Sequence, residues 1–255
     1  MEFSNVYEDI ERAISYSKLE FPGTYYLAYR DLPEIIFEHS KGKRSIDFGC
    51  GTGRSTRFLK DQGFKAEGID ISPEMILIAK QLDPAGNYHL IENSGDGLDR
   101  FLADSYDLIL SVFTFDNIPE YGTKLKIFKE LRKLLNPTGI IVNLVSSPDI
   151  YVNEWASFTT VDFPENRSAK SGDKVKIIMK DVEDKRPVED VVCSHDDYLK
   201  IYSDAGLDVI SFYKPLAKGN ESYQWVSETK IAPWSIYVLK RTRVPGLTAR
   251  MMNSF

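Results

Sequence analysis

The sequence has few cysteines and no long apolar run. Its only two cysteines, Cys50 and Cys193, lie far apart in a chain of 255 residues. This number and spacing exclude a disulfide framework and a zinc-ligand pattern, so we expect no metal site and a reducing, cytoplasmic compartment. No apolar stretch approaches the roughly 20 residues that a membrane span requires, so no membrane association is expected. The N-terminal Met-Glu-Phe-Ser has neither a basic nor an apolar leader, so we expect no signal peptide.

Basic residues are fewer than acidic residues. The chain has 32 Lys and Arg against 38 Asp and Glu, which gives a net charge of −6. Because an acidic chain is not attracted to phosphate backbones, we expect no nucleic-acid partner. A local basic cluster at Lys41, Lys43 and Arg44 is more typical of a solvated strand edge. The length and the 42% hydrophobic content suit one globular α/β domain with a small cap.

Strand and helix patterns alternate from Arg44 onward. The expected strands are 45–48, 66–71, 88–91, 106–113, 140–145, 209–213 and 235–239. The expected helices between them are 54–62, 123–135 and 196–205, and a further one that Ser72 caps. This order predicts an α/β fold with a doubly wound, mostly parallel, seven-stranded, Rossmann-like sheet. Ligands of such sheets bind at the carboxyl ends of the strands.

The pattern divides the chain into five segments. They are a helical N-terminal segment 1–40, a core 41–147, an insertion 148–195, a helix and final strand pair 196–242, and a tail 243–255. The insertion breaks the rhythm of the core and clusters Tyr151, Trp155 and Phe158 ahead of an expected hairpin, 175–179 with 188–192. We expect it to form a cap over the binding site. The alternative is a dimerisation arm.

A glycine-rich turn joins the first expected strand to its helix. It reads Asp47-Phe48-Gly49-Cys50-Gly51-Thr52-Gly53. Glycines allow a tight turn and a close ligand, and the helix N-terminus offers free N–H groups. A dinucleotide site needs G-x-G-x-x-G, but its sixth position here is Arg54, which argues against a dehydrogenase. A turn without any ligand is the alternative interpretation.

The turn resembles motif I of class I methyltransferases that depend on S-adenosylmethionine (SAM). Three further features stand at matching intervals: Asp70, Gly95-Asp96-Gly97 and Ser111-Val112-Phe113. The resemblance covers residues 44 to about 147. It implies the class I fold and SAM as the cofactor, with residues 1–40 covering the cofactor site. It leaves the methyl acceptor open.

The resemblance also implies roles for single residues. Asp47 would serve the amino group of SAM, Asp70 both ribose hydroxyls and Asp96 the adenine. The alternatives are a capping aspartate beside Ser72, a plain turn at residues 95–97 and core packing at residues 111–113. Arg30, one helical turn after Tyr26, would bind the SAM carboxylate, although an exposed helix arginine is equally consistent. The expected cofactor-binding residues are Tyr26, Arg30, Asp47, Gly49, Cys50, Gly51, Gly53, Asp70, Ile71, Asp96, Gly97, Ser111, Val112 and Phe113.

No motif identifies a catalytic base. Displacement at a sulfonium methyl group needs mainly alignment of the reactants and sometimes removal of a proton. Asp116 and His195 are the candidates for that proton, each with a plain structural role as the alternative. Aromatic side chains near the C-terminus would either wall an acceptor pocket or pack in the core. With one acid among them, these residues are Tyr223, Trp225, Glu228 and Trp234.

The pattern as a whole predicts an enzyme that methylates a nitrogen or oxygen of a small molecule. The order of cap, helix and final strands is loosely similar to toxoflavin-synthase-like N-methyltransferases. We expect a monomer or a homodimer. Another enzyme on the same fold, such as an aminopropyltransferase, and a non-catalytic SAM-binding protein are the alternatives.

Overall fold

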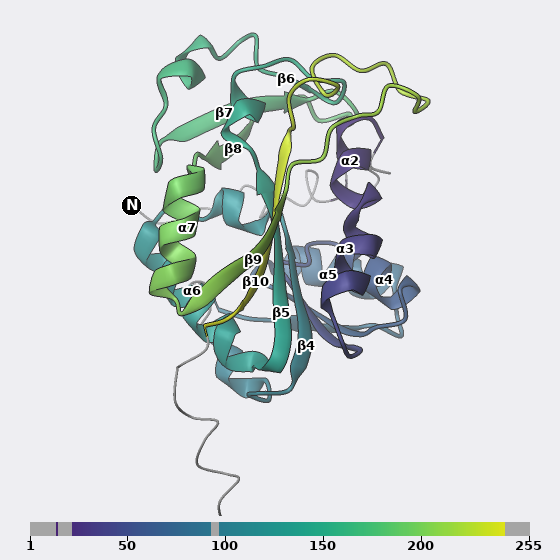
Figure 1. Ribbon diagram of the computed structural model, residues 1–255. Coiled ribbons are helices and arrows are strands. Elements are labelled where there is room, and N and C mark those ends of the chain that lie inside the picture. The colour runs from purple at the N-terminus through teal and green to yellow at the C-terminus, as the bar shows by residue number, and fades with distance from the viewer. Residues whose placement is uncertain (1–13, 15–21, 93–96, 243–255) are drawn as a thin grey trace, which may run out of the picture.

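A seven-stranded sheet forms the centre of the computed structural model, which describes residues 14, 22–92 and 97–242 (Figure 1). The strand order is β3-β2-β1-β4-β5-β10-β9. The strands are β1 Arg44–Phe48, β2 Lys65–Asp70, β3 Asn87–Leu90, β4 Tyr106–Val112, β5 Leu135–Ser146, β9 Leu207–Tyr213 and β10 Trp234–Arg241. The first five run parallel, and β10 is antiparallel to both β5 and β9. The predicted doubly wound, mostly parallel, seven-stranded sheet is confirmed.

Some sequence-based expectations lie outside the described residues. These are residues 1–13 and 15–21 of the expected helical N-terminal segment, the tail 243–255, and Asp96 with its neighbour Gly95.

Helices cover both faces of the sheet. In Figure 1, α3, α4 and α5 lie on one side and α6 and α7 on the other. The helices of the described chain that matter here are α2 Thr24–Arg30, α3 Leu32–His39, α4 Arg54–Asp61, α5 Pro73–Leu82, α6 Tyr121–Leu134 and α7 His195–Asp204. Between the two layers, β4 is buried on both faces, with Leu108, Ile109 and Leu110 fully inaccessible. This burial explains why its sequence is apolar almost throughout.

One boundary differs from the sequence-based prediction. We expected a helix as far as Leu135, a turn at Pro137-Thr138-Gly139 and a strand from Ile140, but β5 already begins at Leu135. Leu135 pairs with Tyr106 of β4, and the register then shifts before Leu108 pairs with Ile140. Gly139 makes the close approach possible, because a Cβ there would lie 2.5 Å from the backbone oxygen of Tyr106.

The insertion after β5, residues 148–195, is called the cap. It holds a three-stranded antiparallel sheet of β6 Phe158–Thr159, β7 Lys174–Met179 and β8 Val188–Val191. The predicted hairpin is confirmed by the β7–β8 pairing, whereas β6 was not expected. Of two short helices in the cap, η5 Pro148–Tyr151 precedes β6 and η6 Pro164–Ser168 connects β6 to β7. Figure 1 shows the cap beyond the end of the sheet where β5 finishes.

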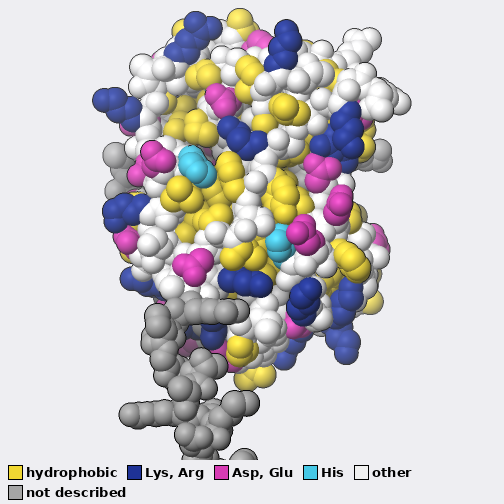
Figure 2. Space-filling model, viewed as in Figure 1, with side chains coloured by type: hydrophobic (Ala, Val, Ile, Leu, Met, Phe, Trp, Pro, Cys, Tyr) yellow, Lys and Arg dark blue, Asp and Glu magenta, His cyan; other side chains and the backbone are white. Residues whose placement is uncertain are grey.

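The described surface carries both polar and apolar regions. Figure 2 shows hydrophobic side chains gathered over the middle of one face, where β9 forms the edge of the sheet. Ile210 and Phe212 of this strand are exposed. Within residues 14, 22–92 and 97–242, no helix combines the length and apolar character that crossing a membrane requires.

Candidate functional site

The glycine-rich turn, residues 47–53, lies between β1 and α4 and is called the cofactor turn. Gly49, Gly51 and Gly53 all have positive φ, at 71°, 52° and 80°. These are left-handed conformations that residues with a Cβ adopt only under strain. The N–H groups of Gly49 and Cys50 both donate to the backbone oxygen of Ile69 in β2, at 2.8 and 3.0 Å. The turn is thus pinned to the neighbouring strand.

Space remains open beside one glycine of the cofactor turn. A Cβ on Gly51 would meet only the Met75 sulfur, at 3.9 Å. A Cβ on Gly53 would instead lie 2.6 Å from the Tyr88 hydroxyl. Gly53 therefore serves close packing, while Gly51 leaves bare main chain facing free space. A ligand that lies against the backbone fits there.

Asp47 is fully buried at the carboxyl end of β1. Its Oδ2 accepts hydrogen bonds from the Ser55 and Thr56 hydroxyls, at 2.7 and 2.6 Å, which ties the start of α4 to the strand. Its Oδ1 has no partner among the described residues. Burial raises the pKa of Asp47 to about 6. A carboxylate oxygen without a protein partner fits a cationic group such as the amino group of SAM.

Asp70 ends β2 and holds the cofactor turn. Its carboxylate accepts from the N–H groups of Gly51 and Ser72, at 2.8 and 2.9 Å. Burial raises the pKa of this carboxyl. A carboxylate has about four acceptor positions, so these two bonds leave capacity for ribose hydroxyls. The following residue, Ile71, packs with the core on the α6 and α7 side. Asp70 thus has a structural role beside Ser72, as the alternative interpretation of the sequence expected, and it also holds the cofactor turn.

Gly97 and the end of β4 complete the expected cofactor residues within the described chain. Gly97 has φ of 89° and nothing within 4 Å of a built Cβ. In β4, Ser111 is fully buried and its hydroxyl has no partner in the described part, and Val112 ends the strand. Phe113 then takes a left-handed conformation with φ of 62°, which is strained for a bulky residue.

Thr114 links the cofactor turn to the end of β4. Its hydroxyl donates to the backbone oxygen of Phe48 at 2.9 Å. A Cβ on Gly49 would lie within 2.2 Å of the same side chain. Sequence reasoning missed Thr114, because no motif includes it and its contact spans 66 residues.

Arg30 and Tyr26 lie on α2, where the structure gives both of them protein partners. The Arg30 guanidinium binds Asp31 through two hydrogen bonds, at 2.7 and 2.8 Å, and its Nη1 donates to Glu221 at 3.1 Å. The Tyr26 ring lies 5.4 Å from that of Tyr223. Binding of the SAM carboxylate by Arg30 stays a prediction, and it would require exchange of these partners.

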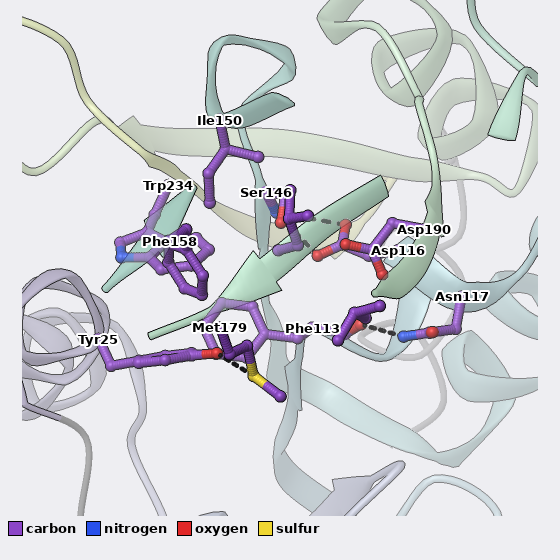
Figure 3. Close-up of a pocket in the computed structure, with 12 residues that line it drawn as sticks. Tyr25, Phe113, Asp116, Asn117, Ser146, Ile150, Phe158, Met179, Asp190 and Trp234 are labelled. Carbon is purple, nitrogen blue, oxygen red and sulfur yellow. Dashed lines mark hydrogen bonds between the residues drawn. The ribbon is translucent and has the colours of Figure 1, made fainter. Parts of the chain in front are cut away.

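A pocket lies between the sheet and the cap, and we call it the cap pocket (Figure 3). The cavity measures about 40 Å³ and is partly open to the surface, so a ligand with a ring would extend out of it. It is lined by Tyr25, Phe113, Asp116, Asn117, Ser146, Ile150, Phe158, Ile177, Met179, Val188, Asp190 and Trp234. These residues come from α2, from the ends of β4 and β5, from the cap, and from the start of β10. Of the residues singled out in the sequence, the pocket brings together Phe113, Asp116, Phe158 and Trp234.

Several residues expected near the acceptor do not line this pocket, namely Tyr151, Trp155, His195, Tyr223, Trp225 and Glu228. His195 begins α7 and is exposed. Its Nδ1 lies 2.8 Å from the Tyr237 hydroxyl, and its ring packs on Phe212 at the sheet edge. Trp155 is fully buried behind the pocket wall, and its indole N–H donates to the Ile150 oxygen at 2.8 Å. The role of His195 as a base stays a prediction that this location does not favour.

Glu228 fastens the cap to the rest of the molecule. Its Oε1 accepts from the Thr24 hydroxyl at 2.6 Å and from the Ala156 N–H at 2.7 Å, and its Oε2 accepts from the Val226 N–H. The residue is fully buried. One carboxylate therefore joins α2, the cap and the segment that precedes β10.

Asp116 is buried in the wall of the cap pocket, and its environment predicts a pH effect. Both carboxylate oxygens accept from the Ser146 N–H, and burial raises the pKa to about 6. The folded state therefore binds more protons than the unfolded state between about pH 4 and 6, so its stability falls as the pH rises through that window. Asp116→Asn should remove this fall. We expect its free energy of unfolding, relative to the unmodified protein, to rise by about 3 kcal/mol from pH 4 to 7.

Urea unfolding at pH 4, 5, 6 and 7 measures this difference. The matched control is Asp162→Asn, which removes a charge from an exposed position of the same cap. It should leave the pH dependence unchanged. Parallel profiles for Asp116→Asn and the unmodified protein would contradict the raised pKa.

Comparison with known proteins places the chain in a family. Residues 23–181 match the family model described as a methyltransferase domain. A demethylmenaquinone methyltransferase of Bacillus velezensis is 30% identical over 136 residues, which are 51% of this chain and 57% of that protein. A 2-methyl-6-phytyl-1,4-hydroquinone methyltransferase of Synechocystis is 34% identical over 102 residues, 40% of this chain and 31% of that protein. The chain thus spans less than two thirds of these curated relatives.

Solved structures share the fold at low sequence identity. A SAM-dependent methyltransferase of Clostridium acetobutylicum aligns with a TM-score of 0.63 at 15% identity, covering 92% of this chain and 97% of that one. The 1,6-didemethyltoxoflavin-N1-methyltransferase of Burkholderia thailandensis aligns with a TM-score of 0.52 at 14% identity, covering 85% and 79%. Because the family model spans more than half of the chain and the fold agrees with it, the chain belongs to the methyltransferase-domain family, a family of class I enzymes that use SAM as their cofactor.

Proposed function

We propose that the chain transfers the methyl group of SAM to a nitrogen or oxygen of a small molecule bound in the cap pocket. The curated relatives support a small acceptor, since their names specify demethylmenaquinone and a hydroquinone. The toxoflavin relative was solved with 1,6-didemethyltoxoflavin and S-adenosylhomocysteine, which supports the same class of acceptor.

One junction in the chain carries this proposal. Phe113 lines the cap pocket, and the next residue, Thr114, donates its hydroxyl to Phe48 at the start of the cofactor turn. Two adjacent residues therefore touch the two sites. A methyl group can move directly between ligands only if their sites adjoin, and this junction supports such an arrangement.

Each side of the junction has a distinct task. Asp47, Gly51 and Asp70 would hold the cofactor, through a free carboxylate oxygen, bare backbone and spare acceptor positions. When bound, SAM supplies a methyl group on a sulfonium centre, which needs little further activation. The cap pocket would exclude water and align the acceptor atom with that methyl group. Asp116 would take up a proton where the acceptor must lose one.

Asp70→Ala should weaken binding of S-adenosylhomocysteine by about 2–3 kcal/mol, or roughly 30- to 150-fold, because it removes charge-assisted acceptors for the ribose. The loss includes loosening of the cofactor turn, since Asp70 also accepts from the Gly51 N–H. Isothermal titration measures the affinity. Asp61→Ala, an exposed acid on α4, is the control that should bind normally.

Thermal shifts decide the class of cofactor. SAM and S-adenosylhomocysteine should raise the melting temperature, and NAD should not. A shift with NAD alone would refute the proposed function. Unchanged affinity in a folded Asp70→Ala protein would refute the role of this carboxylate.

A further inference from the structure

The cap pocket has two unlike walls (Figure 3). One is the aromatic wall of Tyr25, Phe113, Phe158 and Trp234. Its rings pack on one another, with centroids 4.6 Å apart for Phe113 and Trp234 and 4.8 Å for Tyr25 and Phe158. The other wall holds two carboxylates, Asp116 and Asp190, which we call the acid pair. An occupant must therefore suit both an aromatic surface and negative charge.

Asp190 turns an unsatisfied oxygen toward the cavity. Its Oδ2 accepts from the Tyr151 hydroxyl at 3.2 Å, whereas its Oδ1 has no partner in the described part of the chain. The residue is only 6% exposed and lines the pocket. This oxygen is accessible from the pocket, so a ligand bound there can donate a hydrogen bond to it.

The charges around the acid pair do not balance. The nearest cation is Lys124, which is 2% exposed and has no hydrogen-bond partner within the described residues. Its Nζ lies over the Tyr198 ring, 5.2 Å from the centroid, and it forms no ion pair with either acid of the described pocket. Two carboxylates and one ammonium leave one excess negative charge when all three are ionised.

The excess negative charge favours protonation of one carboxyl group of the acid pair. Burial and the neighbouring Asp116 raise the pKa of Asp190 well above its usual range, and burial lowers that of Lys124. The other titratable groups nearby, Tyr151, Cys193 and Asp197, add no positive charge. A ligand that brings one positive charge would take the place of that proton.

We propose that the methyl acceptor is an organic amine, whose ammonium group binds the acid pair while its ring or apolar part lies on the aromatic wall. Before transfer the ammonium group gives one proton to the Asp116 carboxylate. The freed nitrogen lone pair then forms the bond to the methyl carbon as the bond between that carbon and the sulfonium sulfur breaks, which leaves S-adenosylhomocysteine. This inference rests on the proposed function. Charge-assisted hydrogen bonds to the free Asp190 oxygen and packing of a ring on the aromatic wall favour the same chemistry. A carboxylate or phosphate ligand would be repelled, and a neutral ring would leave Asp190 Oδ1 without a donor.

Matched probes test the preference. Benzylamine and tryptamine carry an ammonium group at neutral pH, while benzyl alcohol and indole-3-ethanol have nearly the same shape without the charge. Ligand-observed NMR titrations measure the affinities with and without saturating S-adenosylhomocysteine. We expect each amine to bind at least tenfold more tightly than its alcohol. In Asp190→Asn, which keeps the shape and the acceptor for Tyr151, the preference should fall about tenfold.

Control variants and a cofactor titration separate the possible failures. Asp162→Asn removes an exposed charge from the cap and should keep the full preference. Asp116→Asn provides a second variant in case Asp190→Asn does not fold, and circular dichroism checks both. Equal binding of amines and alcohols, or a preference that survives in the Asn variants, would overturn the inference while S-adenosylhomocysteine still binds. Failure of S-adenosylhomocysteine to bind would instead overturn the proposed function, and the acceptor role with it.

Discussion

Trp155→Ala should lower the free energy of unfolding by about 3–5 kcal/mol, the usual cost of a cavity that replaces a large buried aromatic side chain. Trp155 is fully buried in the cap, and its indole N–H donates to the Ile150 oxygen. Its backbone N–H donates to the Phe158 oxygen at 3.2 Å. Since Ile150 and Phe158 both line the cap pocket, the substitution should also disturb acceptor binding, although Trp155 itself stands behind the wall.

Urea unfolding and binding measurements check both parts. Trp225→Ala is the matched control, because Trp225 is only partly buried and should cost less. Trp155→Phe keeps most of the volume and should fall between the two. Affinity for S-adenosylhomocysteine should stay within about twofold, since the cofactor turn lies outside the cap. A loss below about 1 kcal/mol for Trp155→Ala would contradict its place in the core of the cap.

Gly49→Ala should lower the free energy of unfolding by about 2–4 kcal/mol and weaken S-adenosylhomocysteine binding at least tenfold. Two costs add at this position. The φ of 71° strains any residue with a Cβ, and that Cβ would lie 2.2–2.7 Å from three atoms of Thr114. Thr114 would have to move and give up its hydrogen bond to Phe48.

A second glycine separates the two costs. Gly172 has φ of 96° but nothing within 4 Å of a built Cβ, so Gly172→Ala should show only the backbone strain, about 1–2 kcal/mol. Its S-adenosylhomocysteine affinity should be normal. Equal losses of stability in the two variants would show that the Thr114 side chain moves aside without a free-energy cost. They would contradict the proposed link between the cofactor turn and β4.

The parts of the fold that could be predicted from the sequence are those that neighbouring residues along the chain determine. Residues 47–53 have a spacing that few turns share, and β4 is apolar because both of its faces are buried. The predicted start of β5 was wrong, because Pro137 and Gly139 are residues that typically end a helix or a strand. Pairing of Leu135 with Tyr106 in β4 overrides that local signal.

The candidate site was predictable only in part, because several of its contacts join distant segments. Asp190 lies in a strand reading Val-Glu-Asp-Val, which gives no sign of which acid is buried. Its burial follows from the register of β8 on β7, where it pairs with Val175. We expected Trp155 to face the acceptor, but it does not line the cap pocket. The sequence indicates that an aromatic side chain is buried, but it does not indicate which side of the pocket wall that side chain occupies.

The three segments that Glu228 joins also bear on the order of folding. Glu228 is 204 residues from Thr24 and 72 from Ala156, whereas Asp70 reaches Gly51 across only 19. Closing a long loop costs more conformational entropy, and non-local contacts slow folding. We therefore expect the cofactor turn to form early and the cap pocket late. On the ribosome, the cap cannot be fastened until residue 228 has emerged, and until then the aromatic wall lacks Trp234 as well.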